Sequence, residues 1–370
     1  MQFECPAELL KKSVSSVERI VGKNPAVPIL NSILVTYSGG IVTVAATNLE
    51  IGVETKFSCP SGKNGSVAIP AKVFSSFLLN IENAEMLIIG VSAHQLSIDV
   101  NNQQTKFQAL SADEFPPFPV QRDVAVISVH RSLFIDAMGR VIVSASPFNI
   151  RQELGSVLFR VRQDLTCVST DSFRLSEVRI APGEFTTTER TQQFMIPVGV
   201  VEECVRIFRD TTDEMIDLHF SPQGVIIRSK DTTIYSRLID GTFPAYEEII
   251  PKQFTTECVV DRQKLFQHIK QAKLFSGKLH DVYLSLKVGE GITLTSESQE
   301  VGQYHAVLPA HITGEGVNIT LNWKYLSDAL QTFTEQEVFI GANKGKDAVL
   351  MKNSTGTHRH LIMPMRGIRE

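Results

Sequence analysis

The residue types that most often carry out catalysis or bind metals are scattered in this chain, and few are spaced for chemistry. His358 and His360 alternate along a predicted strand, so their imidazoles would lie on one face and supply two ligands to a metal ion. No third ligand lies near them in the sequence, and a plain exposed strand is the alternative interpretation.

The remaining candidates for chemistry are weaker. Asp210, Asp213 and Glu214 follow a predicted helix without a positioned partner for acid–base work, as does the pair Asp113-Glu114 at the start of a linker. The triplet at 289–291 (GEG) is too short to enclose a phosphate and is typical of a hairpin turn. The sequence contains none of the motifs GxxxxGK[ST], GxGxxG, HExxH or GxSxG. We therefore predict a binding protein, not an enzyme, with no cofactor and no metal.

One pattern occurs three times along the chain, and it defines the elements around these residues. In each copy an apolar stripe at i, i+3, i+4 and i+7 begins four residues after a marker, which is Pro70, Pro197 or Asn322. The stripes are Phe74/Phe77/Leu78/Ile81, Val201/Cys204/Val205/Phe208 and Leu326/Ala329/Leu330/Phe333. This spacing predicts three amphipathic helices in the same register. Chance periodicity is the alternative, and three matched registers at near-constant spacing disfavour it.

Strand-like runs and a second class of helix recur with the same period. Three short runs follow each helix, at 86–91, 96–100 and 105–110, at 216–220, 225–228 and 233–238, and at 338–340, 348–351 and 357–363. Earlier helices carry the stripes Leu10/Val14/Val17/Val21, Phe134/Met138/Val141 and Leu265/Ile269/Ala272, and each precedes a strand pair, at 32–37 with 42–46, 157–161 with 165–169, and 282–286 with 292–295. We predict three α+β domains at 1–121, 122–251 and 252–370, each with two helices packed on antiparallel sheets. Proline-bearing aromatic linkers at 115–119 and 243–246 would join them.

Composition sets the class of molecule. The chain of 370 residues is 43% hydrophobic and 21% charged, which is ordinary for a globular protein. No run approaches the roughly 18 apolar residues of a membrane span, and the first residues do not resemble a signal peptide. The five cysteines are scattered, which favours a reducing cytoplasm over a disulfide framework.

Positive charge gathers on the first helix of each repeat although the net charge is −4. The segment 262–278 contains five cations and no acidic residue. A basic helical face on an acidic body fits a phosphate backbone, whereas a single charged run is usually a solvated face. Its recurrence in three copies favours nucleic acid.

Three motifs resemble those of a known family, the bacterial DNA polymerase III beta subunits, or beta sliding clamps. The stretch 170–175 (TDSFRL) resembles the family's TDGHRL, 238–246 (LIDGTFPAY) resembles LIDGxFPDY, and 363–366 (MPMR) resembles the MPMR of the family's C-terminus. Their order, the length and the threefold repeat agree, so the resemblance covers the entire chain. Two departures are Ser172-Phe173 in place of Gly-His and the extension Gly367–Glu370.

The resemblance implies a fold and a function. Two chains of three clamp domains would close head to tail into a ring, with helices lining the hole. The ring would encircle double-stranded DNA without reading its sequence, and would tether the replicative polymerase as a processivity factor during replication and repair. The implied partners are DNA, a second copy, the polymerase, the clamp loader and other clamp-motif proteins, with no membrane. The implied location is the cytoplasm, in association with the nucleoid.

The resemblance also implies three sets of residues. A partner-peptide groove would be formed by Leu154, Thr170, Ser172, Phe173, Arg174, Leu175, Pro244, Ile249, Asn322, Tyr325, Leu361, Ile362, Met363, Pro364, Met365 and Arg366. The residues facing DNA would be Lys11, Lys12, Arg19, Lys72, Arg131, Arg140, Arg151, Lys264, Lys270 and Lys273. The dimer interface would join Phe77, Ile81 and Phe107 of one chain to Leu274 and Phe275 of the other. A plain core aromatic is the alternative for Phe107. Phe173, and Glu248 where relatives often carry a cation, would reshape the peptide preference.

Two other functions fit the sequence less well. One is an enzyme whose site is assembled across domains. The other is a repeat-built scaffold that binds proteins without encircling DNA.

Overall fold

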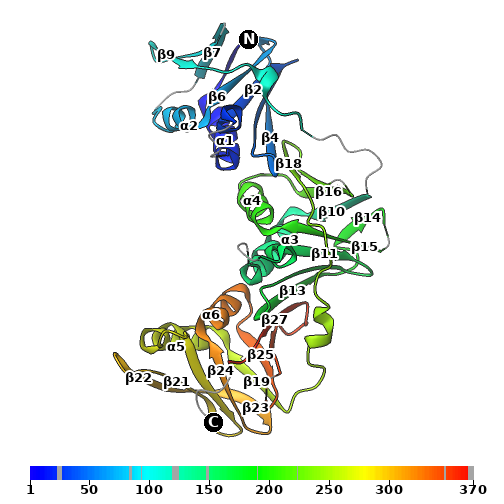
Figure 1. The fold of residues 1–370 in the computed structure, drawn as a ribbon, viewed down its shortest axis with the longest axis vertical. Coiled ribbons are helices and arrows are strands. Elements are labelled where there is room, and N and C mark those ends of the chain that lie inside the picture. The colour runs from blue at the N-terminus through cyan, green and yellow to red at the C-terminus, as the bar shows by residue number, and fades with distance from the viewer. Residues whose placement is uncertain are drawn as a thin grey trace. The chain divides into compact units, whose positions relative to one another are not determined.

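The computed structural model of the chain describes residues 1–22, 27–82, 86–92, 94–118, 125–146, 150–189, 191–222, 224–345 and 347–365 (Figure 1). Contacts divide it into two compact units. The first unit comprises 1–131, 186–188 and 206–238, and the second comprises 132–185, 189–205 and 239–370. The boundary therefore passes through α3 (Arg131–Val141) and α4 (Val198–Arg209).

The first unit contains a five-stranded and a nine-stranded antiparallel sheet. The smaller sheet has the order β5-β1-β7-β8-β9, with bounds Gly62–Lys63, Gln2–Pro6, Met86–Ser92, Gln95–Val100 and Gln103–Gln108. The larger has the order β14-β10-β16-β17-β18-β4-β3-β2-β6, with bounds Phe185–Thr187, Ala125–His130, Met215–Ser221, Gly224–Arg228, Thr232–Ser236, Ile51–Ser58, Ile41–Thr47, Ser32–Ser38 and Gly65–Pro70. The short 3-10 helices of the first unit are η1 (Glu18–Ile20), η2 (Pro28–Asn31) and η3 (Ala112–Glu114).

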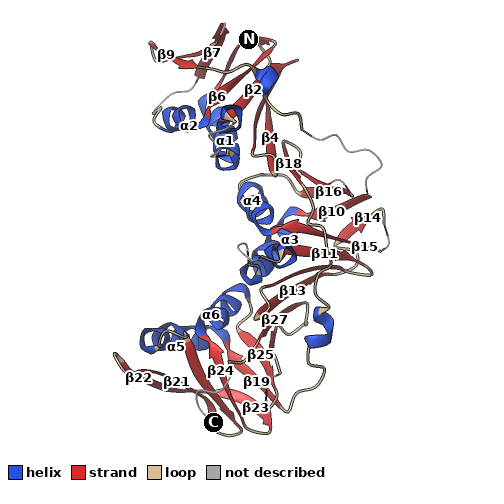
Figure 2. Cartoon of the chain, viewed as in Figure 1, coloured by secondary structure: helices blue, strands red, loops and turns tan. Residues whose placement is uncertain are grey.

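Helices α1 (Ala7–Val17) and α2 (Ala71–Leu79) lie side by side in this unit (Figure 2). Each starts directly after a proline, Pro6 or Pro70, which has no backbone N–H to leave unsatisfied. The predicted stripes are buried, as Leu10 and Phe74 illustrate. Ile81 lies beyond the end of α2 and is still buried, so the apolar pattern outruns the helix.

Strands β4 and β18 join two repeats of the chain into one sheet. Five residue pairs run from Thr232 opposite Thr55 to Ser236 opposite Ile51. These segments are about 180 residues apart in sequence, and their ladder makes the outer strands of the central repeat part of the first unit.

The second unit also contains two antiparallel sheets. The larger has the order β15-β11-β12-β13-β27-β26-β25-β19-β23, with bounds Gln192–Pro197, Ser156–Val161, Leu165–Thr170, Arg174–Ile180, His358–Ile362, Val349–Lys352, Glu337–Ala342, Thr256–Asp261 and Ala310–Gly314. The smaller has the order β22-β21-β20-β24, with bounds Gly302–Leu308, Gly291–Ser298, Asp281–Lys287 and Val317–Asn322. Its 3-10 helices are η4 (Ile142–Ser144), η5 (Gln152–Gly155), η6 (Tyr246–Ile249) and η7 (Lys273–Phe275).

Helices α5 (Arg262–Ala272) and α6 (Trp323–Thr332) lie side by side and close the core of this unit. Asp261 caps α5 because its side chain accepts the N–H of Lys264 at 2.8 Å. The predicted stripe of α5 is wholly buried. Phe333 is buried but extended, so α6 ends one residue before the last position of its stripe.

A second junction of the same kind joins β13 to β27, from Arg174 opposite Ile362 to Val178 opposite His358. Strand β13 was not predicted from the sequence, and neither were the equivalent strands β4 and β22. Each follows a predicted strand pair, and all three contain polar or charged residues that weaken the strand signal.

Candidate functional site: an apolar groove and two open sheet edges

A groove of about 200 Å³ lies on the second unit, between the sheet around β13 and the linker that carries η6. Its lining residues are Arg151, Thr170, Ser172, Phe173, Arg174, Leu175, Pro244, Ala245, Tyr246, Ile249, Leu361 and Met363. We call this cavity the linker groove. Beneath it the linker packs on the sheet, since Phe243 and Tyr246 share a buried cluster with Leu175 and Leu361.

The turn from Thr170 to Arg174 forms one end of the groove. Asp171 Oδ1 accepts the N–H groups of Phe173 and Arg174, both at 2.9 Å. These bonds fix the turn so that the Phe173 ring is 62% exposed. A large apolar side chain held in solvent at a groove is typical of a binding surface.

Ser172 takes a left-handed backbone conformation in this turn, with φ of 78°. Residues with a Cβ are strained there, whereas glycine is not. We expect Ser172→Gly to raise the free energy of unfolding by about 0.5 to 1 kcal/mol. Urea unfolding of the wild type, Ser172→Gly and Ser172→Ala would measure this. A Ser172→Gly variant no more stable than Ser172→Ala would show that the turn is unstrained.

Arg174 connects the turn to α6. Its guanidinium lies 2.9 Å from Asp171 and 2.5 Å from Asp328, and stacks 4.5 Å from the centre of the Tyr325 ring. This sandwich brings Tyr325 beside the groove residues without placing it on the groove wall. Burial, followed by the Asp171 charge, raises the pKa of the Tyr325 hydroxyl.

Residues 363–365, which follow β27, make two backbone hydrogen bonds to other segments. Met363 N–H donates to Phe173 O at 2.8 Å, and Met365 N–H donates to Thr320 O at 2.9 Å. Met363 and Ile249 also line a second hollow, which includes Glu248. The second hollow measures about 420 Å³ and carries Lys252 and Asp347 on its rim.

The structure gathers nine of the predicted groove residues around one cavity, and it adds Arg151, Ala245 and Tyr246. Leu154 and Ile362 are buried beneath the surface, and the Asn322 side chain accepts the Lys324 N–H to cap α6. Pro364 and Met365 are half-buried next to the groove strand, and Arg366 and Gly367–Glu370 lie outside the described residues. Arg151 was expected to face DNA. In the structure it also lines the groove, where it pairs with Glu153 at 3.2 Å.

The histidine pair is not on an exposed strand, so that interpretation was wrong. His358 and His360 are buried because β27 lies between β13 and β26. His360 contacts Thr332 Oγ1 and Ser176 Oγ, each at 2.7 Å, and Arg140 Nη1 lies 3.2 Å from His358 Nδ1. Burial, followed by the Arg140 charge, lowers the pKa of His358 to about 3. No group of three His, Cys, Asp or Glu residues in the described part of the chain could hold a metal ion.

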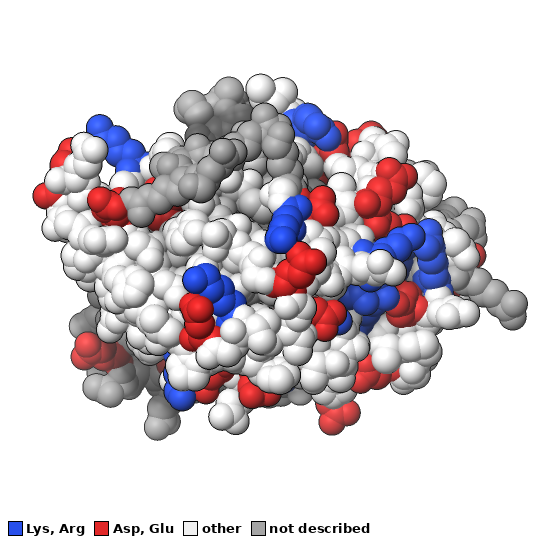
Figure 3. Space-filling view, turned by 90° about the horizontal axis from the view of Figure 1, so that it is seen from below, with Lys and Arg blue, Asp and Glu red and all other residues white. Residues whose placement is uncertain are grey.

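The predicted DNA-facing cations fall into two groups. Lys12, Arg19, Lys72, Lys264, Lys270 and Lys273 are exposed on or next to α1, α2 and α5. Three others are held by their own chain. Lys11 donates to Ile81 O at 2.8 Å, Arg131 donates to Asp213 O at 2.7 Å, and Arg140 pairs with Asp136 at 2.9 Å. Figure 3 shows basic and acidic side chains interspersed on the face that it draws.

Two strands leave open edges at equivalent positions of the repeat. The last strand of the second copy, β18, pairs with β4, and the last strand of the third copy, β27, pairs with β13. The last strand of the first copy is β9, and the strand equivalent to β4 and β13 in the third copy is β22. Each of these two ends its sheet among the described strands.

The predicted interface residues lie next to these edges. Phe107 on β9 packs edge-on against Phe77 at 5.2 Å and Phe74 at 5.8 Å, so its ring is largely buried in its own chain. Leu274 in η7 is 64% exposed, and Phe275 stacks at 6.0 Å on Tyr304 of β22.

Fold and site together define a class of protein: a repeat-built binding protein with an apolar groove and two open sheet edges at equivalent positions of the repeat. Comparisons with known proteins identify the family. Models of the N-terminal, central and C-terminal domains of the DNA polymerase III beta subunit match residues 1–119, 128–245 and 247–366. The chain belongs to the DNA polymerase III beta subunit family. Its role is that of a DNA sliding clamp in replication, and it is not itself an enzyme.

Similar proteins match over nearly the whole chain. The beta sliding clamp of Bacillus subtilis is 27% identical over 379 residues, covering 99% of this chain and all of that protein. That of Synechococcus elongatus is 24% identical over 374 residues, covering 99% of each. The crystal structure of the Bacillus subtilis DNA polymerase sliding clamp superposes with a TM-score of 0.93 at 26% identity, covering 99% of each chain. Among the described residues, no helix is both long and apolar enough to cross a membrane.

Proposed function

We propose that two copies of this chain join head to tail through β9 and β22 and close a ring around duplex DNA. The observation that carries this proposal is the repeated joint within the chain. The chain makes the same edge-to-edge contact at β18–β4 and at β27–β13, and β9 and β22 are the equivalent strands left open. A heterologous contact of this kind forms a ring when the rotation between copies closes.

The apolar residues next to the open edges support the joint. Leu274 and Phe275 are the side chains that a partner strand would cover, because Leu274 is exposed and Phe275 already stands beside β22. Phe77, Ile81 and Phe107 would form the opposing patch. Phe107 is buried against Phe77 of its own chain, so it would support the surface that the partner contacts.

The ring would hold DNA topologically. The exposed cations Lys12, Arg19, Lys72, Lys264, Lys270 and Lys273 would face the duplex. Scattered lysines attract phosphates without reading bases, so the ring can move along the duplex. We assign a smaller part to Lys11, Arg131 and Arg140, whose side chains are already bound within the chain.

The linker groove would bind peptides of the replicative polymerase, the clamp loader and other clamp-motif proteins. Phe173, Ile249 and Met363 offer apolar contact area, and Met363 can repack for different peptides. Tethering raises the effective concentration of the polymerase at the primer end without any catalytic group.

The finer organisation follows from the same proposal. We place the domain boundaries at 121 and 251, which gives three clamp domains, 1–121, 122–251 and 252–370. We also place the protein in the cytoplasm at the nucleoid, where its DNA would be.

Retention on DNA tests encirclement. After loading onto nicked circular DNA by a clamp loader with ATP, the protein is expected to stay on the circle through gel filtration and to leave once a restriction enzyme linearises it. Only a ring that encircles the DNA would stay on a closed circle and slide off a free end. Equal retention on linear and circular DNA would contradict encirclement, and no retention on either would favour the alternative function, a protein-binding scaffold.

A further inference from the structure

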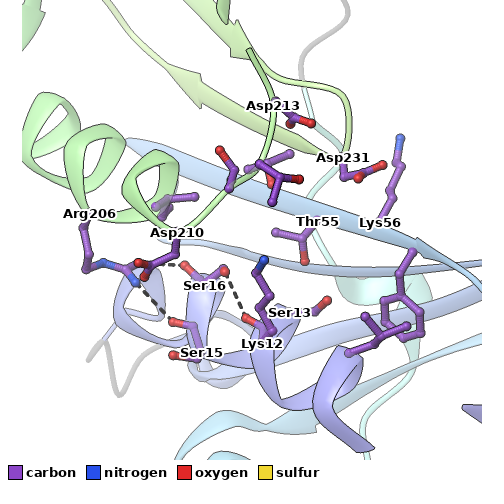
Figure 4. A pocket seen from close by; sticks show the side chains of 16 residues that line it. Lys12, Ser13, Ser15, Ser16, Thr55, Lys56, Arg206, Asp210, Asp213 and Asp231 are labelled. Carbon is purple, nitrogen blue, oxygen red and sulfur yellow. Dashed lines mark hydrogen bonds between the residues drawn. The ribbon is translucent and has the colours of Figure 1, made fainter. Parts of the chain in front are cut away.

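The first unit contains a cavity that lies apart from the groove and from the sheet edges. It measures about 190 Å³ and lies between α1, β4 and the residues that follow α4 (Figure 4). Its polar wall is formed by Lys12, Thr55, Arg206, Asp210, Asp213 and Asp231. We call it the α1–β4 pocket.

A buried hydroxyl in the pocket has no partner. The Thr55 residue is 5% exposed, and its Oγ1 makes no hydrogen bond within the described part of the chain. Figure 4 shows Thr55 between α1 and the loops that carry Asp213 and Asp231. Because burial of an unsatisfied hydroxyl is costly, Thr55 indicates that a polar group occupies the pocket.

The positive charges of the pocket are mostly engaged already. Lys56 pairs with Glu54 at 2.7 Å, and Arg206 donates to the carbonyls of Ser15 and Ser16 at 3.3 and 2.7 Å. Figure 4 shows the Lys12 side chain pointing from α1 into the pocket, and its ammonium group makes no hydrogen bond or ion pair with the described residues.

The three carboxylates of the pocket, in contrast, form no ion pairs with the described residues. None of the ion pairs between described residues includes Asp210, Asp213 or Asp231. Asp213 Oδ2 accepts only a backbone N–H, that of Lys230, at 3.0 Å. The pocket thus combines three carboxylates with the unpartnered Thr55 hydroxyl, which can accept a hydrogen bond. These groups favour a ligand that donates hydrogen bonds and carries positive charge.

The placement of these acids distinguishes between cations. Asp210 and Asp213 come from one loop, and Asp231 comes from another. Among the described residues, no group of three His, Cys, Asp or Glu side chains could hold one metal ion. An elongated organic cation with separated amines fits such a site better than a single ion. We propose that the α1–β4 pocket binds a linear alkylpolyammonium ion, whose ammonium groups donate to Asp210, Asp213, Asp231 and Thr55 Oγ1.

Binding would connect α1 and β4 to the segments after α4 and before β18, which are distant in sequence. The ligand would therefore stabilise the first unit, and it would do so without touching the linker groove. This inference is independent of the proposed function, since the pocket lies within one chain.

Titration calorimetry with spermidine on the full-length protein, in buffer with about 0.15 M salt, tests the proposal. We expect saturable binding of one spermidine per chain. Asp210→Asn combined with Asp231→Asn should weaken it by on the order of tenfold or more, because charge-assisted hydrogen bonds are lost. Glu114→Gln combined with Glu300→Gln removes two exposed charges elsewhere and should leave binding unchanged.

Thr55→Val separates the site from a general effect on folding. Without spermidine this variant should unfold at the same temperature as the wild type or higher, because the hydroxyl has no partner to lose. With spermidine its affinity should fall about fivefold. Non-saturable binding, equal weakening in the control pair, unchanged affinity in Thr55→Val, or saturable binding of Mg²⁺ alone with the same dependence on Asp210 and Asp231 would each overturn the proposal.

Discussion

Leu274→Ala combined with Phe275→Ala is expected to convert the dimer into monomers. Leu274 is 64% exposed in the single chain, so its side chain adds little to the stability of the fold. At a dimer interface the same side chain would be covered, and truncation of a central apolar anchor typically costs about 2 kcal/mol or more of binding free energy. Because the ring has two such interfaces, four truncated side chains amount to about 8 kcal/mol, or roughly a millionfold weaker association.

Light scattering at micromolar concentration would measure the mass, and the circular-DNA assay would report retention. Val288→Ala removes an apolar side chain that is 56% exposed, from the turn between β20 and β21, and it serves as the control. Circular dichroism would verify the fold, since Phe275 also packs on Tyr304. A dimer mass that persists in the double variant would reject this interface.

Mild acid is expected to destabilise the second unit through His358 and His360. Burial, with the neighbouring Arg140, holds the pKa of His358 near 3, and burial with the His358 charge holds that of His360 well below 6.5. The unfolded chain therefore takes up two protons near pH 6.5 that the folded chain does not. The free energy of unfolding should fall as the pH drops below 6.5, by about 2 kcal/mol for each histidine between pH 7.5 and pH 5.

Urea unfolding at pH 7.5, 6 and 5 would measure this loss. His360→Gln should reduce the slope of stability against pH by about half, since one of the two titrating groups is gone. His311→Gln changes an exposed histidine and should leave the slope unchanged. Equal slopes in the wild type and His360→Gln would show that the histidine pair does not control acid stability.

The groove shows how much of the candidate site the sequence motifs predicted. The resemblance identified the turn at Thr170, the linker at Pro244 and the strand at Leu361, and the structure brings these three segments together. It did not identify Tyr246 or Ala245, which lie within the matched linker motif and line the same cavity. It also did not place Arg151 in the groove, which that residue lines in the structure.

Local periodicity in the sequence determined the helices and the threefold repeat. Apolar residues at helical spacing must be buried on one side, so Leu265, Ile269 and Ala272 could be predicted as core from their spacing alone.

The tertiary structure alone decided which strands pair across repeats. Backbone hydrogen bonds can join any two strands, so no local pattern within β4 or β13 identifies β18 or β27 as the partner. The same pairing buries His358, whose polar sequence context suggested exposure. It also brings Thr55 to Asp231 across a long sequence separation, and so creates a pocket that no local pattern encodes.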